Sequence, residues 1–152
     1  MLYDIHIRRF SLSDLPRVME IEHASFSVDA FSEGTFKRWY SKCPDLFIVA
    51  EVSGLILGYM STCILPEKGD NVSIAVDPLH RHKGVGRALV DYTLKELASS
   101  KVKVVELEVR TTNVEAIRFW ESFGFFPIGT IPHFYRDGAA ALRMRKFLDK
   151  DQ

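Results

Sequence analysis

The sequence lacks three features that mark large classes of protein. Its 20 basic and 20 acidic residues cancel, so no overall charge draws this chain of 152 residues to nucleic acid or to an anionic membrane. No apolar run approaches the roughly 20 residues that span a bilayer, and the N-terminus does not look like a signal peptide. The two cysteines, Cys43 and Cys63, match no metal-ligand spacing. We therefore predict reduced, structural thiols, no bound metal and a cytoplasmic protein.

Composition and length predict a single domain over residues 1–152. Hydrophobic residues make up 47% of the chain and charged residues 26%, which suffices for one core and a soluble surface. The length matches one domain, since domains commonly hold about 100–150 residues. The sequence contains no internal repeat, low-complexity tract or linker.

Hydrophobic periodicity predicts helices and strands in a mixed order. The predicted strands lie at residues 5–8, 46–50, 55–59, 72–76, 102–109, 125–130 and 140–147. The predicted helices lie at residues 15–26, around 36–40, at 84–97 and between Asn113 and Gly124, and residues 66–70 are predicted to form a surface loop. Because the two kinds of element neither alternate strictly nor segregate, we expect a mixed sheet.

The segment from Val72 to Arg87 is typical of an anion-binding turn. An apolar strand ends at Asp77-Pro78, and a basic run that contains two glycines leads into a helix. Glycine lets the backbone approach a ligand closely, and a helix N-terminus favours negative charge. A diphosphate suits such a turn, whereas a solvated basic surface is the alternative.

Two other glycine motifs fit this segment poorly. A P-loop ends in Gly-Lys-Ser/Thr, but Arg87-Ala88 follows Gly86 here, which excludes it. A dinucleotide fingerprint requires a third glycine where this chain has Leu89.

A second segment makes the chain similar to a known family. The pattern Asn-x-x-Ala-Ile-x-Phe-x-x-x-x-Gly-Phe begins at Asn113, and Ile74-Ala75-Val76-Asp77-Pro78 precedes the Arg-x-x-Gly-x-Gly turn. With the element order, these motifs resemble the GCN5-related N-acetyltransferase (GNAT) superfamily, in the branch that acetylates ribosomal proteins and protein N-terminal α-amines. The resemblance covers nearly the whole chain. It implies an α/β fold whose mixed, mostly antiparallel sheet has about seven strands, helices on both faces and a splay between the fourth and fifth strands.

The resemblance also implies a site for acetyl-coenzyme A (acetyl-CoA) as co-substrate. Strand residues Ile74 and Val76 would bind the pantetheine arm in the splay, where the Val76 amide would polarise the thioester carbonyl. Asn113 would reach the same arm with its amide, a role compatible with capping the helix that follows. The diphosphate would be held by the turn, which comprises Arg81, His82, Lys83, Gly84, Val85, Gly86 and Arg87.

A carboxylate on the strand at residues 102–109 is the predicted proton acceptor. Period-two alternation places Glu106, Glu108 and Arg110 on one face of that strand. Acyl transfer requires a neutral amine, so an ammonium substrate has to lose a proton. The resemblance points to Glu108 as the group that receives it, directly or through water. The alternative is that Glu106 and Glu108 form surface ion pairs with nearby lysines.

One position departs from the family pattern. Where the family commonly has a tyrosine that protonates the leaving thiolate, this chain has Trp120, whose indole N–H is a poor proton donor. Three alternatives stay open: water protonates the thiolate, another tyrosine such as Tyr135 does so, or the protein is a non-catalytic acyl-CoA-binding module.

The acceptor that the resemblance implies is the α-amine of a protein N-terminus. A neutral α-amine is cheaper to form than a neutral lysine by about 3.5 kcal/mol, from the pKa values of the two amines. In this branch the peptide lies between two loops that correspond to residues 27–31 and 132–138, where Phe31 and Tyr135 would grip it. A lysine or small-amine acetyltransferase is the alternative enzyme. The sequence predicts no nucleic-acid partner and leaves the oligomeric state open.

Overall fold

A computed structural model describes residues 3–66 and 68–148, with the backbone alone at residues 71 and 72. The described chain forms two compact units. One consists of the chain up to Cys63 together with Asn71–Leu97, and the other of Ile64–Asp70 together with the chain from Ala98. The prediction of a single domain over residues 1–152 stays a prediction.

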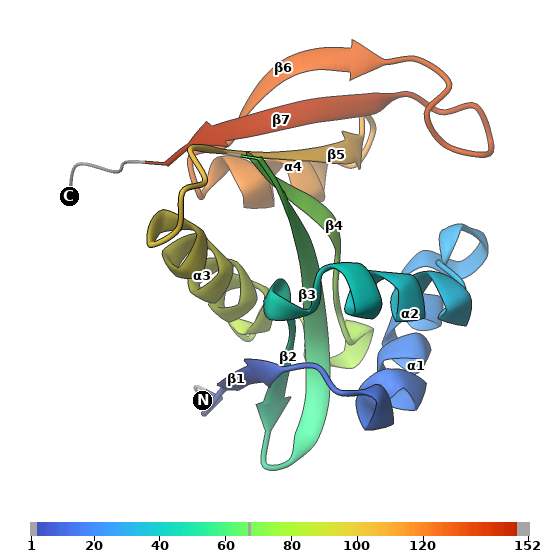
Figure 1. The fold of residues 1–152 in the computed structure, drawn as a ribbon. Coiled ribbons are helices and arrows are strands. Elements are labelled where there is room, and N and C mark those ends of the chain that lie inside the picture. The colour runs from blue at the N-terminus through green and yellow to red at the C-terminus, as the bar shows by residue number, and fades with distance from the viewer. Residues whose placement is uncertain (1–2, 67, 149–152) are drawn as a thin grey trace. The chain divides into compact units, whose positions relative to one another are not determined.

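The strands form the predicted kind of sheet. They are β1 (His6–Arg9), β2 (Phe47–Val52), β3 (Leu55–Leu65), β4 (Lys68–Val76), β5 (Val104–Arg110), β6 (Phe126–Ile131) and β7 (Ala141–Phe147). These seven strands hydrogen-bond in the order β1-β2-β3-β4-β5-β7-β6 (Figure 1). The pairs β1–β2, β2–β3, β5–β7 and β6–β7 are antiparallel, whereas β4 and β5 are parallel. The predicted mixed, mostly antiparallel sheet of about seven strands is confirmed.

Strand β4 begins earlier than the sequence predicts. Residues 66–70 were expected to form a loop, but Lys68–Asp70 pair with Val104–Glu106 of β5. Gly69 and Asp70 have low strand propensity, and pairing with a distant segment overrides that local preference. The described parallel pairing comprises the first three residues of each of the two strands, all in the second unit.

Helices cover both faces of the strands in the first unit. The α-helices of the chain are α1 (Leu15–Phe26), α2 (Glu33–Lys42), α3 (Val85–Ala98) and α4 (Val114–Glu121). Tyr59 of β3 packs in one cluster with Val18 of α1 and Phe36 of α2. Its neighbour Gly58 faces α3, where an added Cβ would lie 3.2 Å from Leu89. Since successive strand residues point to opposite faces, α1 and α2 cover one face of β3 and α3 covers the other (Figure 1).

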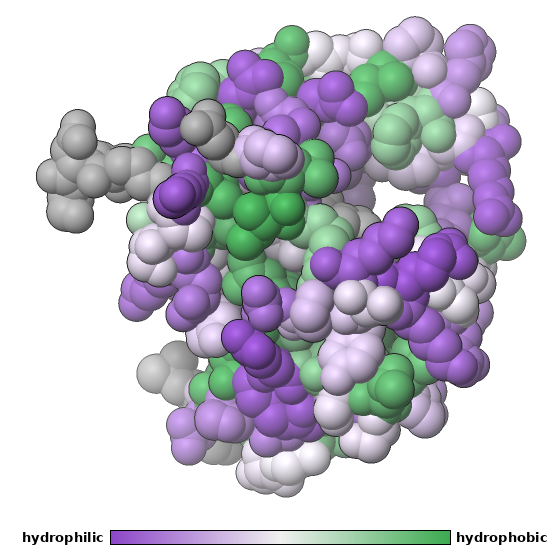
Figure 2. Space-filling view, in the orientation of Figure 1, coloured by the Kyte–Doolittle hydropathy of each residue, from purple (hydrophilic) through white to green (hydrophobic). Residues whose placement is uncertain are grey.

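Helix α2 is amphipathic. Phe36 is fully buried, while most other side chains of the helix are exposed or half-buried. Figure 2 shows mainly hydrophilic surface over α2 on the face in view. Among the described helices, none is long and apolar enough to cross a bilayer.

The second unit contains the predicted helix with both of its boundary signals. The Asn113 side chain accepts a hydrogen bond from the Ala116 amide at 3.1 Å, which confirms Asn113 as the N-cap of α4. Beyond the other end of α4, Gly124 has a φ of 91°, in the left-handed region that favours glycine. Trp120, only 3% exposed, packs edge-on against Phe125 with their ring centres 5.2 Å apart.

The two cysteines are not reduced thiols. Cys43, directly after α2, and Cys63 of β3 form a disulfide, with their Cα atoms 5.2 Å apart. The prediction of two free structural thiols is therefore wrong. Spacing along the chain could not reveal the pair, because the contact depends on how α2 packs beside β3.

Candidate active site

The turn between β4 and α3 has a backbone that suits close approach of a ligand. Gly84 has a φ of 89°, a conformation that residues other than glycine rarely adopt. His82 also has a positive φ, of 62°. Helix α3 begins directly afterwards at Val85, which is buried, so the helix start is anchored in the core. The first amides of a helix have no partner within the helix and can bind an anion.

Positive charge gathers at this turn. Arg81, His82, Lys83 and Arg87 are all exposed, while Gly86 between them is half-buried. Arg81, Lys83 and Arg87 thus place three cationic side chains at one helix N-terminus of a protein whose formal net charge is zero with histidine neutral. The predicted anion-binding residues are together in one short segment, as a diphosphate site requires.

Hydrogen bonds fix the start of the turn to the sheet. The Asp77 amide donates to the Leu57 carbonyl of β3 at 2.7 Å. The Asp77 carboxylate accepts from the Leu79 amide at 3.0 Å and caps the 3-10 helix Pro78–His80. The position of the basic turn therefore follows from the sheet of the first unit.

The predicted residues for the pantetheine arm lie just before this turn. Ile74 and Val76 are half-buried, whereas Ser73, which precedes them, and Ala75, which lies between them, are buried. The alternation puts Ile74 and Val76 on the same, more accessible face of β4. Asn113 belongs to the second unit, where its side chain is exposed.

Glu108, the predicted proton acceptor, is a half-buried residue of β5. The Arg143 Nε donates to its Oε2 at 3.1 Å from the adjacent strand β7. The contact fixes the orientation of the carboxylate. The alternative of a surface pair between Glu108 and a lysine is not observed in the described chain, since the partner is an arginine.

Glu106, two residues earlier, is in a different environment. It is 5% exposed, and its carboxylate lies 2.6 Å from Lys68 Nζ and 2.7 Å from Arg145 Nε. The hydrogen bond from Lys68 lowers the pKa of Glu106 below its ordinary 4.5; burial opposes this, and Arg145 adds to it. Glu106 therefore forms the ion pair with a lysine that the alternative expected, but its carboxylate is buried and only the two cations are partly exposed.

Asp70 is a further acidic group that the sequence did not single out. Asp70 pairs with Glu106 in the parallel ladder, so the two side chains lie on the same face of the sheet. Glu108, two residues after Glu106, lies on that face as well. Burial raises the pKa of Asp70 above its ordinary 3.8, and the charge of Glu108 raises it further. No sequence pattern indicated Asp70, because it falls within residues 66–70, for which a surface loop is predicted.

The two predicted substrate residues lie in exposed loops. Phe31 is 40% exposed and stands edge-on to Trp39, with ring centres 4.8 Å apart, in the first unit. Tyr135 is half-buried in the second unit, where the guanidinium of Arg110 lies 4.3 Å from the centre of its ring. Tyr135 also stands edge-on to Phe134, with ring centres 5.0 Å apart, so both aromatic rings have neighbours within their own unit.

Comparison with known proteins assigns the chain to a family. Residues 11–125 match the model of the Acetyltransferase (GNAT) family. The chain belongs to the GNAT family. It is therefore an acetyltransferase, as the resemblance implied.

Relatives of this GNAT protein act as N-acetyltransferases. The chain is 30% identical over 151 residues to the N-alpha-acetyltransferase of Sulfolobus acidocaldarius, covering 91% of this chain and 89% of the relative. It is 31% identical over 119 residues to the ribosomal protein bS18-alanine N-acetyltransferase of Escherichia coli, covering 78% and 79%. The crystal structure of Ard1 from Thermoplasma volcanium matches with a TM-score of 0.92 and 30% identity, covering 95% of this chain and 98% of that one. The fold expected from the sequence is confirmed.

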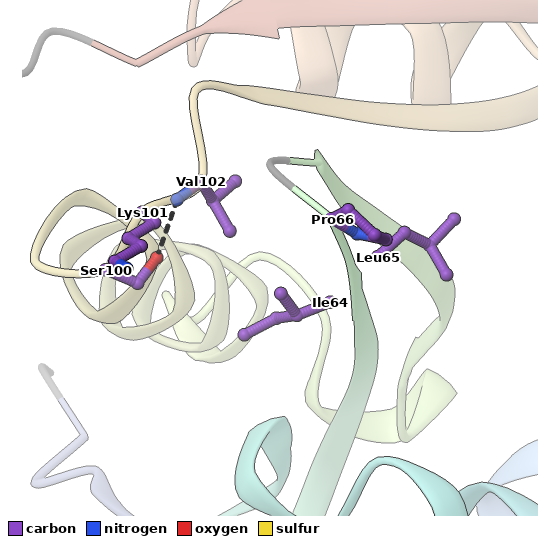
Figure 3. A pocket seen from close by; sticks show the side chains of 6 residues that line it. All are labelled: Ile64, Leu65, Pro66, Ser100, Lys101 and Val102. Carbon is purple, nitrogen blue, oxygen red and sulfur yellow. Dashed lines mark hydrogen bonds between the residues drawn. The ribbon is translucent and has the colours of Figure 1, made fainter.

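The GNAT chain also has a pocket away from the predicted site residues. It has a volume of about 480 Å³ in the second unit, and Figure 3 shows that its lining includes Ile64 and Leu65 from β3 and Val102 before β5. Val102 donates its amide to Ser100 Oγ at 3.1 Å beside the pocket. The pocket is lined by none of the residues predicted to bind acetyl-CoA or peptide.

Proposed function

We propose that this GNAT enzyme transfers the acetyl group of acetyl-CoA to the α-amine of protein N-termini. The observation that carries the proposal is the 30% identity, over 91% of this chain, to an N-alpha-acetyltransferase. A second N-alpha-acetyltransferase, from Sulfurisphaera tokodaii, is 29% identical over 93% of this chain and supports the same substrate class.

The β4–α3 turn is the proposed site of the cofactor diphosphate. Backbone amides from Gly84 to Arg87 would donate to its oxygens, and the exposed side chains of Arg81 and Lys83 would neutralise its charge. Ile74 and Val76, on the accessible face of β4, would hold the pantetheine arm with their main-chain groups.

The chemical step is a direct transfer. The amine nitrogen attacks the thioester carbonyl carbon, the C–S bond breaks, and coenzyme A leaves as a thiolate. Glu108 accepts the proton that the ammonium loses, directly or through one water. The Arg143 contact at 3.1 Å supports this role, because it holds the carboxylate in one orientation.

The leaving thiolate needs no tyrosine at the position of Trp120. A thiol with a pKa near that of cysteine, about 8.5, leaves readily as the thiolate and takes its proton from water. The burial of Trp120 at 3% exposure, against Phe125, supports a packing role for the indole. Tyr135 is better suited to contact the peptide, since its half-buried ring lies in a loop.

The first experiment follows acetyl transfer from labelled acetyl-CoA to peptides with free N-termini. One peptide carries an N-terminal alanine, the residue that the name of the Escherichia coli relative gives together with ribosomal protein bS18. Each peptide is paired with an α-blocked copy that retains its lysines, and mass spectrometry locates the label. We expect label on free α-amines alone; label that persists on the blocked copies would move the assignment to lysine.

A further inference from the structure

A buried carboxylate in the first unit has no role in the chemical step described above. Glu22 lies in the middle of α1 and is 0% exposed. Its partner Tyr59 belongs to a hydrophobic cluster that also contains the buried residues Val18, Ile21 and Phe36. Burying an ionised carboxylate is costly unless its oxygens accept hydrogen bonds, so its partners indicate why it is retained.

Both oxygens of Glu22 accept hydrogen bonds. The Tyr59 hydroxyl of β3 donates to Oε1, and the main-chain amide of Phe31 donates to Oε2 at 2.9 Å. The Tyr59 oxygen also lies 2.6 Å from Ser73 Oγ of β4. Since Tyr59 donates its proton to Glu22, Ser73 donates to Tyr59. Burial raises the pKa of Glu22, while the Phe31 amide and the Tyr59 hydroxyl act in the opposite direction.

The Phe31 amide belongs to the exposed loop between α1 and α2. The loop begins at Ser27, which has a φ of 49°, a conformation that is uncommon for a residue with a side chain. It exposes two apolar side chains, with Val28 at 85% and Phe31 at 40%. Exposed apolar side chains grouped on one loop suit contact with another chain, and the loop needs an anchor to hold them in place.

We propose that Glu22 is a positioning residue for the peptide substrate, which holds the loop of Phe31 in its binding conformation. The inference rests on the proposed function, because it takes Phe31 as a peptide contact. Glu22 is fully buried and does not itself touch substrate. Through Tyr59 and Ser73 the same network reaches β4 directly before Ile74, so the peptide loop and the proposed cofactor strand share one set of buried hydrogen bonds.

The decisive variants separate this role from a general effect on folding. Glu22→Leu fills the same space without an acceptor for the Phe31 amide. Glu22→Gln keeps that acceptor, since its amide NH2 donates to Tyr59, which then donates to Ser73. Tyr59→Phe removes the other half of the network and leaves the contact between Glu22 and Phe31 intact.

Steady-state kinetics with the free N-terminal peptide give the readout. A hydrogen bond to a charged group contributes about 1.5–3 kcal/mol, so we expect Glu22→Leu to raise the peptide KM by about tenfold or more. In Glu22→Leu the acetyl-CoA KM should change by less than about twofold. In Glu22→Gln the peptide KM should lie close to the wild-type value. Tyr59→Phe should lower the melting temperature and leave the peptide KM nearly unchanged, since it removes the hydrogen bond to Glu22 Oε1 and keeps the bond from the Phe31 amide to Oε2.

A matched pair in the exposed loop tests the same contact if Glu22→Leu does not fold. Phe31→Ala and Phe31→Pro both remove the ring, but only proline removes the N–H that Glu22 accepts. Ala30 has φ −60° and ψ 136°, which suits the residue before a proline. We expect the proline variant to have the higher peptide KM by about tenfold, for the same lost hydrogen bond.

The outcomes distinguish this inference from the function on which it rests. The positioning role would be overturned if Phe31→Ala and Phe31→Pro had equal peptide KM values, or if Glu22→Leu raised the peptide KM and the acetyl-CoA KM equally. In either case, acetylation of free N-termini by the wild-type protein would still uphold the proposed function. A wild-type protein that acetylates no free N-terminus would overturn both.

Discussion

The Arg17 guanidinium of α1 lies 2.6 Å from the Asp77 carboxylate at the end of β4. The same guanidinium donates through Nε to the Ile56 carbonyl of β3 at 2.9 Å. Burial raises the pKa of Asp77, but the Leu79 amide and Arg17 together bring it below its ordinary 3.8. Arg17 thus joins a helix, a strand and the cap of the 3-10 helix Pro78–His80, which leads into the proposed diphosphate turn.

We expect Arg17→Gln to weaken acetyl-CoA binding. Without the guanidinium, Asp77 loses one of the contacts that fix the turn, so the turn has to be ordered when the cofactor binds. The loss of stability should be about 1–2 kcal/mol, since the Arg17 side chain is 27% exposed and its pair is partly screened. Calorimetry gives the affinity and thermal melting the stability. Arg38→Gln, at an exposed position of α2, is the matched control. Equal acetyl-CoA affinities in Arg17→Gln and Arg38→Gln would exclude the anchoring role of Arg17.

Glu108→Gln should lower turnover far more than cofactor affinity. General base catalysis commonly contributes about 10²–10⁴-fold, and glutamine cannot accept the proton. We expect kcat to fall by about a hundredfold while the affinity for acetyl-CoA stays within about threefold. Glu121→Gln at the end of α4 serves as the control for loss of one negative charge. A wild-type rate in Glu108→Gln would remove Glu108 from the mechanism.

Asp70 should respond to the same substitution. The charge of Glu108 contributes to the raised pKa of Asp70, second only to burial. Removal of that charge in Glu108→Gln should therefore lower the Asp70 pKa toward 3.8, although burial keeps it raised. NMR titration of the Asp70 carboxyl carbon measures both values. An unchanged Asp70 titration would show that the two carboxylates do not interact.

Elements with strong local signals were predictable from the sequence. The helix over residues 15–26, the Asn113 cap and Gly124 beyond the end of α4 each depend on residues within a few positions, and all three are confirmed. Lys68–Asp70 were missed because their strand exists only through pairing with β5. Local propensity carries no information about that partner.

The environment of the site residues was less predictable than their identity. Motifs indicated Glu108 and the basic turn, but the burial of Glu106 depends on Arg145 of β7, which is 39 positions away. Glu22 offered one unused signal, because this carboxylate follows Leu15 and Val18 at the three- and four-residue steps of one helix face. Such a residue has to find partners in the core, and only the folded chain shows that they are Tyr59 and the Phe31 amide.

Glu106 should make the protein sensitive to acid. Its pKa in the folded chain lies below 4.5, so the unfolded chain binds this proton more tightly. Its contribution to stability is therefore fully present above about pH 4.5 and is lost as the pH falls through the folded-state value. Glu106→Gln should cost about 1–3 kcal/mol at pH 7, less than a fully buried pair because Lys68 and Arg145 are each 35% exposed. Chemical denaturation at pH 7 and pH 3 should show that difference shrinking at pH 3, and a constant difference would contradict the assignment.

The Cys43–Cys63 disulfide should stabilise the folded chain. It closes a loop with a sequence separation of 20, for which the reduction in unfolded-state entropy is worth about 3 kcal/mol. Replacing both cysteines by alanine should then lower the melting temperature by about 10 °C for a chain of this size. Dithiothreitol should produce the same fall in the wild type and none in the double variant, because only the wild type has a bond to reduce. A wild-type melting temperature that is indifferent to the reductant would mean that the two sulfurs are not joined in the purified protein.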